Sequence, residues 1–259
     1  MRGLRSALLV LLAGLVPALA LAQMGGGSGA EFSATAVQTD SSGKEMMTFK
    51  MYVGADGMRR TETTQNGQRM VQIMVPTQGT LLMIFPDQKA YMERRGAPAP
   101  AVDTSSDPCA GQPNLTCKLL GEETINGRSA KKWEIVSHHE GQTATGIQWI
   151  DAERGTPLRQ QRPDGTLLEL KMIGQENLQG RAVEKWEMTI TPPSGQGDPV
   201  KTLQWYDPAI KVFVRQELAG GGVSELRDIQ VGPQPKELFQ VPAGYQLVQP
   251  PQQQQAPQR

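Results

Sequence analysis

The sequence predicts an all-β protein that consists of one large, curved antiparallel sheet, or half-barrel, with few or short helices. Runs in which apolar and polar residues alternate, as in strands with one wet face, recur along the chain. Outside residues 1–22, only one short helical segment is expected, around residues 236–240. Hairpin-type turn signals separate the runs at Asp56-Gly57, Asn66-Gly67, Asn126-Gly127 and Pro163-Asp164-Gly165.

The first element in chain order is a secretory signal peptide over residues 1–22. Arg2 and Arg5 precede an apolar run that begins at Ala7 and ends among small residues at Ala22. The run is short for a membrane span, and no later stretch is apolar enough to form one. We therefore expect a secreted, periplasmic protein without stable membrane insertion.

The remainder of the chain divides by composition. Residues 23–30 are rich in glycine and predict a flexible leader, whereas residues 249–259 are rich in glutamine and proline and predict a disordered tail. Residues 31–248 are long enough for a single β domain. Its expected parts, in order, are Met-rich strands at 31–96, a Pro/Ser-rich connector at 97–117 and a strand meander at 118–248.

Charge excludes one class of partner. When Arg2 and Arg5 leave with the signal peptide, 24 of the 26 basic residues remain against 26 acidic residues. A nucleic-acid-binding protein would show a basic excess. We therefore expect no nucleic acid as a partner.

The two cysteines, Cys109 and Cys117, lie in a loop rich in proline, glycine and asparagine. A redox or metal pair would call for CxxC spacing or a histidine close in sequence, and neither is present. In an oxidising compartment this pattern predicts a structural disulfide that fixes the connector.

The meander contains an internal repeat. Residues 119–135 (LLGEETINGRSAKKWEI) match 172–188 (MIGQENLQGRAVEKWEM), and residues 146–161 match 202–217. Two copies cannot close a propeller, so the repeat predicts a duplicated four-strand meander within one continuous sheet. The copies place tryptophans at matching positions: Trp133, Trp149, Trp186 and Trp205.

The amino-terminal strands are unusually rich in methionine, since eight of the twelve methionines fall between Met46 and Met92. Two interpretations are open: methionine fills a core, or it forms a soft surface for a flexible apolar ligand. The second interpretation, joined to the repeated tryptophans, places the following candidate ligand-binding residues on one side of the curved sheet: Met47, Phe49, Met51, Met70, Met74, Leu81, Met83, Phe85, Trp133, Trp149, Trp186 and Trp205.

Catalytic motifs are not found in the sequence. His138 and His139, the only histidines, are adjacent on an expected strand, so their side chains should point to opposite faces. There is no HExxH, GxSxG or glycine-rich phosphate loop. We expect a protein that is not an enzyme, with no catalytic residue, no metal and no cofactor.

With these parts in place, the chain resembles the LolA/LolB-type periplasmic lipoprotein carriers and their uncharacterised relatives. A P-D-x-K-x-Y hairpin is matched by Pro86, Asp87, Lys89 and Tyr91. The closing segment is matched by Leu238, Phe239, Val241, Pro242, Gly244 and Tyr245. The resemblance, over residues 31–248, implies a curved half-barrel whose concave face takes acyl chains or other lipids, and a role in outer-membrane lipoprotein sorting. It also implies a cavity arginine, which corresponds to Arg59 or Arg60.

Two functions from different classes remain open. The first is a soluble periplasmic carrier or sensor that binds a hydrophobic ligand, a lipid or an acyl chain, on the concave face of the sheet. The second is a non-enzymatic envelope adaptor that binds a protein partner through its sheet or edge strands.

Overall fold

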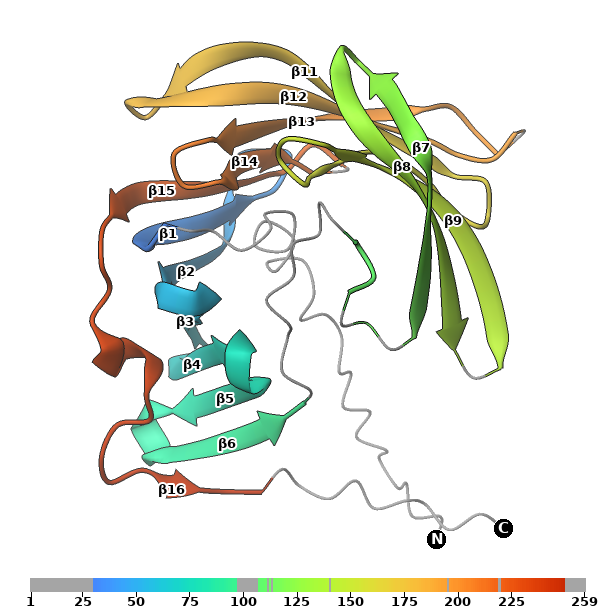
Figure 1. Ribbon diagram of the computed structural model, residues 1–259. Helices are drawn as coiled ribbons and strands as arrows, with labels where there is room; N and C mark the ends of the chain where they lie inside the picture. Colours follow the sequence, from blue (N-terminus) through green and yellow to red (C-terminus); the bar gives the residue numbers. More distant parts are fainter. Residues whose placement is uncertain are drawn as a thin grey trace, which may run out of the picture.

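The protein is built from one sheet of 16 strands, shown by the computed structural model in Figure 1. Residues 30–249 are described, except 97–106, 111, 113, 140, 195 and 219. The strand order is β16-β6-β5-β4-β3-β2-β1-β15-β14-β13-β12-β11-β10-β9-β8-β7. All pairs are antiparallel except β16 with β6. The all-β prediction is confirmed, whereas the signal peptide, most of the connector and nearly all of the tail lie outside the described residues.

The strand bounds are as follows. The strands up to the connector are β1 (Phe32–Thr39), β2 (Glu45–Val53), β3 (Arg59–Gln65), β4 (Gln68–Val75), β5 (Thr80–Phe85) and β6 (Ala90–Arg95). The strands after it are β7 (Leu115–Ile125), β8 (Arg128–His139), β9 (Gln142–Asp151), β10 (Pro157–Gln161), β11 (Leu167–Leu178), β12 (Arg181–Thr191), β13 (Val200–Asp207), β14 (Val212–Glu217), β15 (Val223–Val231) and β16 (Gln246–Leu247). Helical turns in the described residues are the 3-10 helices η1 (Ala55–Gly57), η2 (Pro76–Gln78), η3 (Pro86–Gln88) and η4 (Lys236–Phe239).

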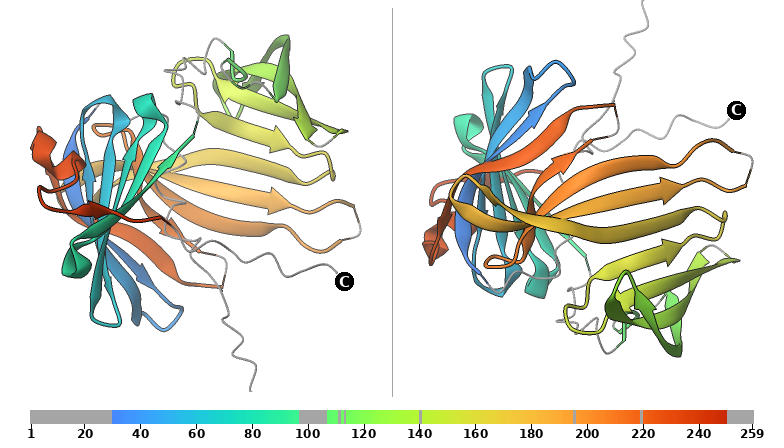
Figure 2. Two further views of the ribbon diagram at one scale, coloured as in Figure 1. Left: turned by 90° about the horizontal axis from the view of Figure 1, so that it is seen from below. Right: turned by 90° about the horizontal axis from the view of Figure 1, so that it is seen from above.

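The sheet bends into two walls, which the views from below and above in Figure 2 separate clearly. We call β1–β6 the amino-terminal wall and β7–β14 the repeat wall. Strand β15 joins them, because it pairs with β14 on one side and with β1 on the other. No helix among the described residues is long and apolar enough to cross a membrane.

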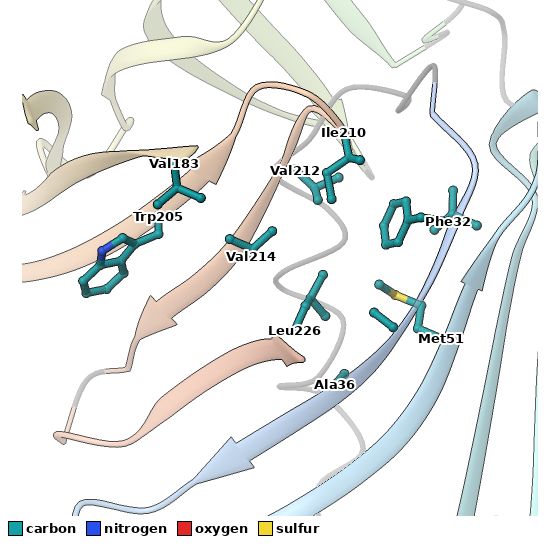
Figure 3. Close-up of a cluster of buried hydrophobic side chains, with 11 residues drawn as sticks. Phe32, Ala36, Met51, Val183, Trp205, Ile210, Val212, Val214 and Leu226 are labelled. Atoms are coloured by element: carbon teal, nitrogen blue, oxygen red, sulfur yellow. The ribbon is translucent and has the colours of Figure 1, made fainter. Parts of the chain in front are cut away.

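Apolar side chains fill the corner between the walls, as Figure 3 shows. Phe32 and Met51 from the amino-terminal wall meet Val212 and Leu226 from β14 and β15. Each such side chain, when fully buried, contributes roughly 1.5–3 kcal/mol relative to exposure. We call the face of the amino-terminal wall that carries Met51 its inner face, because it looks into this corner.

The opposite, outer face of the amino-terminal wall is covered by the chain segment 232–248, which we call the strap (Figure 1). Phe239 of η4 is buried there against a cluster that includes Ile73 and Ile84. Gly54 makes this contact possible, since a Cβ at that position would lie 2.6 Å from the Phe239 ring. Around Phe239 the outer face is therefore a closed core.

The repeat wall consists of two similar units, β7–β10 and β11–β14. Their first hairpins turn through Asn126-Gly127 (φ 50° and 82°) and Gln179-Gly180 (φ 53° and 79°). Two consecutive positive φ values give the turn twist that matches antiparallel strands. Bulges also recur, one between Leu119 and Gly121 and one between Met172 and Gly174.

The predicted Cys109–Cys117 disulfide is confirmed, with a Cα–Cα distance of 5.6 Å. It ties the end of the connector to the first residues of β7. The Asp107 carboxylate accepts a hydrogen bond of 2.8 Å from the Cys109 backbone N–H, which fixes the loop locally.

Candidate ligand-binding surface

The inner face of the amino-terminal wall carries the methionines singled out in the sequence. Strand register places Met51, Thr61, Gln72, Met83 and Met92 opposite one another across β2–β6. Because successive residues of a strand alternate between faces, the other members of this face follow. They include Met47, Phe49, Arg59, Met70, Met74, Leu81 and Phe85.

The two faces of this wall differ in composition. The outer-face core of β4 and β5 is made of branched aliphatic residues: Val71, Ile73, Val75, Leu82 and Ile84. Those five side chains are at most 8% exposed. On the same two strands, all three methionines, Met70, Met74 and Met83, occupy the inner face, where they are only half-buried. The sequence thus places flexible thioethers on the more accessible face and stiff side chains in the packed one.

Most of the predicted ligand-binding residues of the amino-terminal wall lie together on its inner face. Met47, Phe49, Met70, Met74, Leu81, Met83 and Phe85 are half-buried on the inner face. Met51 differs, since it is 7% exposed and belongs to the corner core. Met92 was missed by sequence reasoning, although its alternation with Tyr91 and Glu93 was a usable signal.

Register also separates the two candidate arginines. Arg59 lies on the inner face, opposite Val53 on one side and Met74 on the other. Arg60 lies on the outer face, where it pairs with Glu62 at 2.7 Å and donates to the Leu238 carbonyl of the strap. Burial lowers the pKa of Arg59, and no hydrogen bond or ion pair to it is found within the described part of the chain.

The expectation that the four tryptophans share one side of the sheet is wrong. In the β8–β9 pair, Trp133 lies opposite Gln148 and Lys132 lies opposite Trp149, so the two indoles occupy opposite faces. In the second unit, Trp186 lies opposite Gln204 and Lys185 opposite Trp205, with the same result. All four indoles are at most 7% exposed, so as a set they do not line the methionine surface.

Trp149 and Trp205 are each flanked by two cationic side chains, in the same arrangement in both units. Trp149 lies between Lys132 and Arg159, whose cationic groups are 5.1 and 5.4 Å from the ring, and its Nε1–H donates to Glu123 at 2.7 Å. In the second unit, Lys185 and Arg215 are both 5.1 Å from the Trp205 ring, and the Trp205 Nε1–H donates to Glu176. Cations over an aromatic face stabilise it electrostatically. The repeated KWE strand is thus explained by architecture.

Buried ion pairs recur at matching positions of the two units. Arg128 donates to Asp151, and Arg181 donates to Asp207; both aspartates are 1% exposed. Burial alone would raise the pKa of Asp151, but the hydrogen bonds from Arg128 and from two backbone amides outweigh it and hold that pKa below its ordinary value. These pairs stabilise turns of the sheet, since each aspartate also accepts hydrogen bonds from backbone N–H groups.

The two units are also joined to each other by an ion pair. Arg154 binds Glu184 through two hydrogen bonds of 2.6 and 2.8 Å. Burial would raise the pKa of Glu184, but the contacts with Arg154 lower it more. The Trp186 Nε1–H also donates to Glu184, whereas in the first unit the Trp133 Nε1 has no partner among the described residues.

A groove of about 550 Å³ is lined mostly by residues of the outer side of the amino-terminal wall. It opens where β2 and β3 stop pairing beyond Lys50 and Glu62. Pro242 and Tyr245 of the strap form another side of it. Phe49 and Met70 of the methionine surface also line the groove, whereas Met74, Leu81 and Met83 do not, so the two overlap only in part.

Metal-ligating side chains of the histidine, cysteine and carboxylate type converge at one place in the described residues. This place is Asp107 with Cys109 and Cys117. Because the two sulfurs are bonded to each other, they offer no thiolate to a metal.

Comparison with known proteins adds the following. A family described as a domain of unknown function (DUF4412) matches residues 35–150. No curated protein matches the chain. Similar solved structures include a LolA superfamily protein from Nitrosomonas europaea, at 13% identity and a TM-score of 0.37, covering 83% of this chain and 90% of that one. A DUF1329 family protein from Desulfovibrio piger is 15% identical, with a TM-score of 0.35 and coverage of 82% and 90%.

A third similar structure is the MucA/MucB complex of Pseudomonas aeruginosa, at 14% identity and a TM-score of 0.22, with coverage of 85% of this chain and 93% of that one. A LolA superfamily protein is thus among the structures to which this chain is similar, as its hairpin motifs indicated. At these identities we take the function from the residues of this chain alone.

Proposed function

We propose that this protein is a carrier or sensor that binds a hydrophobic ligand, a lipid or an acyl chain, on the inner face of its amino-terminal wall. The observation that supports this proposal is the segregation of methionine to that face of β4 and β5. A core needs no such segregation, because Val, Ile and Leu fill the packed face of the same strands. A surface that receives a flexible apolar ligand benefits from adaptable, unbranched side chains.

The energetics of such a surface allow reversible binding. Each methylene removed from water contributes about 0.8 kcal/mol, so even a partly covered acyl chain gains several kcal/mol. Arg59 supplies a cation on the same face without a counterion among the described residues. A carboxylate or ester oxygen at the end of an acyl chain is the group that such a guanidinium would bind.

The remaining parts of the proposal concern location and chemistry. We propose a periplasmic protein, which agrees with the closed Cys109–Cys117 bridge, since disulfides persist in oxidising compartments. We also propose that it acts without catalysis. The buried carboxylates Asp151 and Asp207 are engaged by arginines and by backbone N–H groups, so their roles are structural.

A titration with a fluorescent fatty acid tests the proposal. The ligand's own emission should be followed, because the four indoles are buried away from the surface. We expect saturable binding by the mature protein that is lost in Met83→Asp and Phe85→Asp. Val231→Asp is the matched control, since Val231 is an apolar side chain 54% exposed at the end of β15. Binding that survives both inner-face changes, in folded protein, would refute the proposal.

A second candidate function, an adaptor that binds a protein partner, is favoured by one observation. Strand β7 is an edge of the sheet, and Leu119 and Leu120 on it are 49% and 42% exposed. A partner strand could add to such an edge. Loss of partner binding in Leu120→Asp, together with unchanged fatty-acid binding, would identify this edge as a separate protein site.

A further inference from the structure

Strands β2 and β3 pair with each other over only part of their length. The pairing ends at Lys50 opposite Glu62. Beyond that pair, β2 remains bonded to β1, and β3 remains bonded to β4. The two strands thus form a fork in the sheet, which is closed at the Lys50–Glu62 pair. Thr48 of β2 and Thr64 of β3 line the groove of about 550 Å³, so the groove occupies this fork.

The open edges of the fork present main-chain groups that no strand uses. In an antiparallel pair, residues that bond across the pair alternate with residues whose main-chain groups point the other way. The Gly54 N–H donates to the Met58 carbonyl at 2.9 Å, so even-numbered residues of β2 and β3 point their main-chain groups at each other. The next such position beyond the closed end is Thr48 with Thr64, and these two residues are not paired. The N–H and C=O groups of both threonines therefore point into the groove without a strand partner in the described part of the chain.

The closed end of the fork carries a free cation. Lys50 is exposed there on the outer face, and no hydrogen bond or ion pair to it is found among the described residues. Glu62, directly opposite, is held by Arg60 at 2.7 Å. Arg69, which also lines the groove, is bound to Asp87 at 2.9 Å. A carboxylate that reached the closed end would therefore bind Lys50.

The shape of the fork favours a chain end as its occupant. No third strand fits between β2 and β3 once they pair, so an entering chain must stop at the Lys50–Glu62 pair. On β3, residues 63–65 remain beyond that pair, which at about 3.3 Å per residue leaves room for a segment of roughly three residues. A carboxyl end that points to the closed end brings its carboxylate to Lys50. An amino end in the same place would set two like charges together.

We propose that the fork between β2 and β3 binds the extended carboxyl-terminal end of a partner protein. The main chain of this peptide pairs with Thr64 and Thr48, and its terminal carboxylate binds Lys50. Apolar side chains flank the gap, Phe49 on the inner side and Tyr245 of the strap on the outer side, which suits an apolar terminal residue. Strand addition gives such peptides their affinity, and capture of the carboxylate gives specificity for a chain end.

The test begins with random hexapeptides that have free carboxyl ends, displayed on phage and selected on the mature protein. The enriched sequence is synthesised with a dye at its amino end, once as the free carboxylate and once as the amide, and binding is followed by fluorescence anisotropy. We expect saturable binding of the carboxylate form and roughly 10–100-fold weaker binding of the amide, as for loss of a hydrogen bond between charged groups. Lys50→Gln should weaken binding of the carboxylate form and remove the difference between the two forms.

A matched pair of variants at Thr64 tests the main-chain contact. Thr64→Pro removes the N–H that points into the fork, whereas the bonds between β3 and β4 stay, because they are made by the odd-numbered residues of β3. Thr64→Ala keeps that N–H. We expect Thr64→Pro to weaken peptide binding by about tenfold and Thr64→Ala to bind like the wild type. Circular dichroism checks that both variants are folded.

This site is separate from the lipid surface and from the β7 edge, since Met83 and Leu120 do not line the groove. Met83→Asp and Leu120→Asp should therefore leave peptide binding unchanged, whereas Lys50→Gln and Thr64→Pro should leave fatty-acid binding unchanged. Failure to enrich any sequence, or equal affinity of the carboxylate and amide forms, would overturn the proposal. Peptide binding that survives both Lys50→Gln and Thr64→Pro would overturn it as well.

Discussion

The two walls of the sheet differ in the kinds of side chain that pack on them. In the repeat wall, indoles are held between cations, and buried aspartates bind arginines, so most polar groups there have defined partners. In the amino-terminal wall, the outer face is an aliphatic core beneath the strap, and the inner face is a half-buried methionine surface with an arginine that has no described partner. The difference agrees with the proposed role of the inner face as an adaptable contact surface.

Among the changes that test this difference, loss of a buried ion pair should lower the free energy of unfolding most. Arg128→Leu or Arg181→Leu leaves an aspartate that is 1% exposed without its counterion. Breaking such a pair on one side costs about 3–5 kcal/mol. Urea unfolding of the two variants should show similar losses, because the repeat gives both arginines the same role. If the double change Arg181→Leu, Asp207→Asn were no more stable than Arg181→Leu alone, the ion-pair explanation would be wrong.

The next largest loss of stability is expected at the contact between Gly54 and Phe239 of the strap. In Gly54→Ala the added Cβ would lie 2.6 Å from the Phe239 ring, so the ring or the strap must move. Overpacking of this kind typically costs about 1–3 kcal/mol. Adding Phe239→Leu to Gly54→Ala should recover part of the loss, which thermal unfolding can measure. Equal stability of wild type and Gly54→Ala would mean that the strap does not seal the outer face as described.

Acid should weaken the carboxylate contacts of the repeat wall. The pKa values of Asp151 and Glu184 are held below their ordinary values in the folded protein. Carboxyls with lowered folded pKa values stabilise the fold above their unfolded pKa of about 4, and this stability is lost as pH falls through the folded values. The free energy of unfolding should therefore fall below about pH 4, and less steeply in Asp151→Asn. If the free energy of unfolding fell equally steeply with pH in that variant, Asp151 would not contribute to the acid sensitivity.

The smallest loss of stability is expected from substitutions in the methionine surface. Met74→Leu and Met83→Leu keep volume and apolarity, so each should change stability by less than about 1.5 kcal/mol. The outer-face change Ile73→Ala, at a residue that is 0% exposed, should cost about 2–5 kcal/mol. A large loss in the two methionine variants would show that these side chains are core after all.

Sequence reasoning recovered the fold because it rests on local signals. Alternation identified the strands, and the Asn126-Gly127 turn and the KWE repeat identified the duplicated unit. It failed for the tryptophans because the relative face of Trp133 and Trp149 depends on hairpin register. That register also brings Glu123 and Arg159 to Trp149 from two other strands, and no spacing in the sequence shows this. Arg59 and Arg60 were separable only once Met51 was known to face inward.

The central claim is that the inner-face methionines form the ligand surface, and methionine methyl NMR tests it most directly. Mature protein labelled at the methionine methyl groups would be titrated with an unlabelled fatty acid. We predict that Met70, Met74, Met83 and Met92 shift and saturate together. Met58, which packs against the outer-face core, and Met188, which is buried in the repeat wall, should stay unchanged. Shifts confined to Met58 or Met188, or saturable binding without any inner-face shift, would contradict the account.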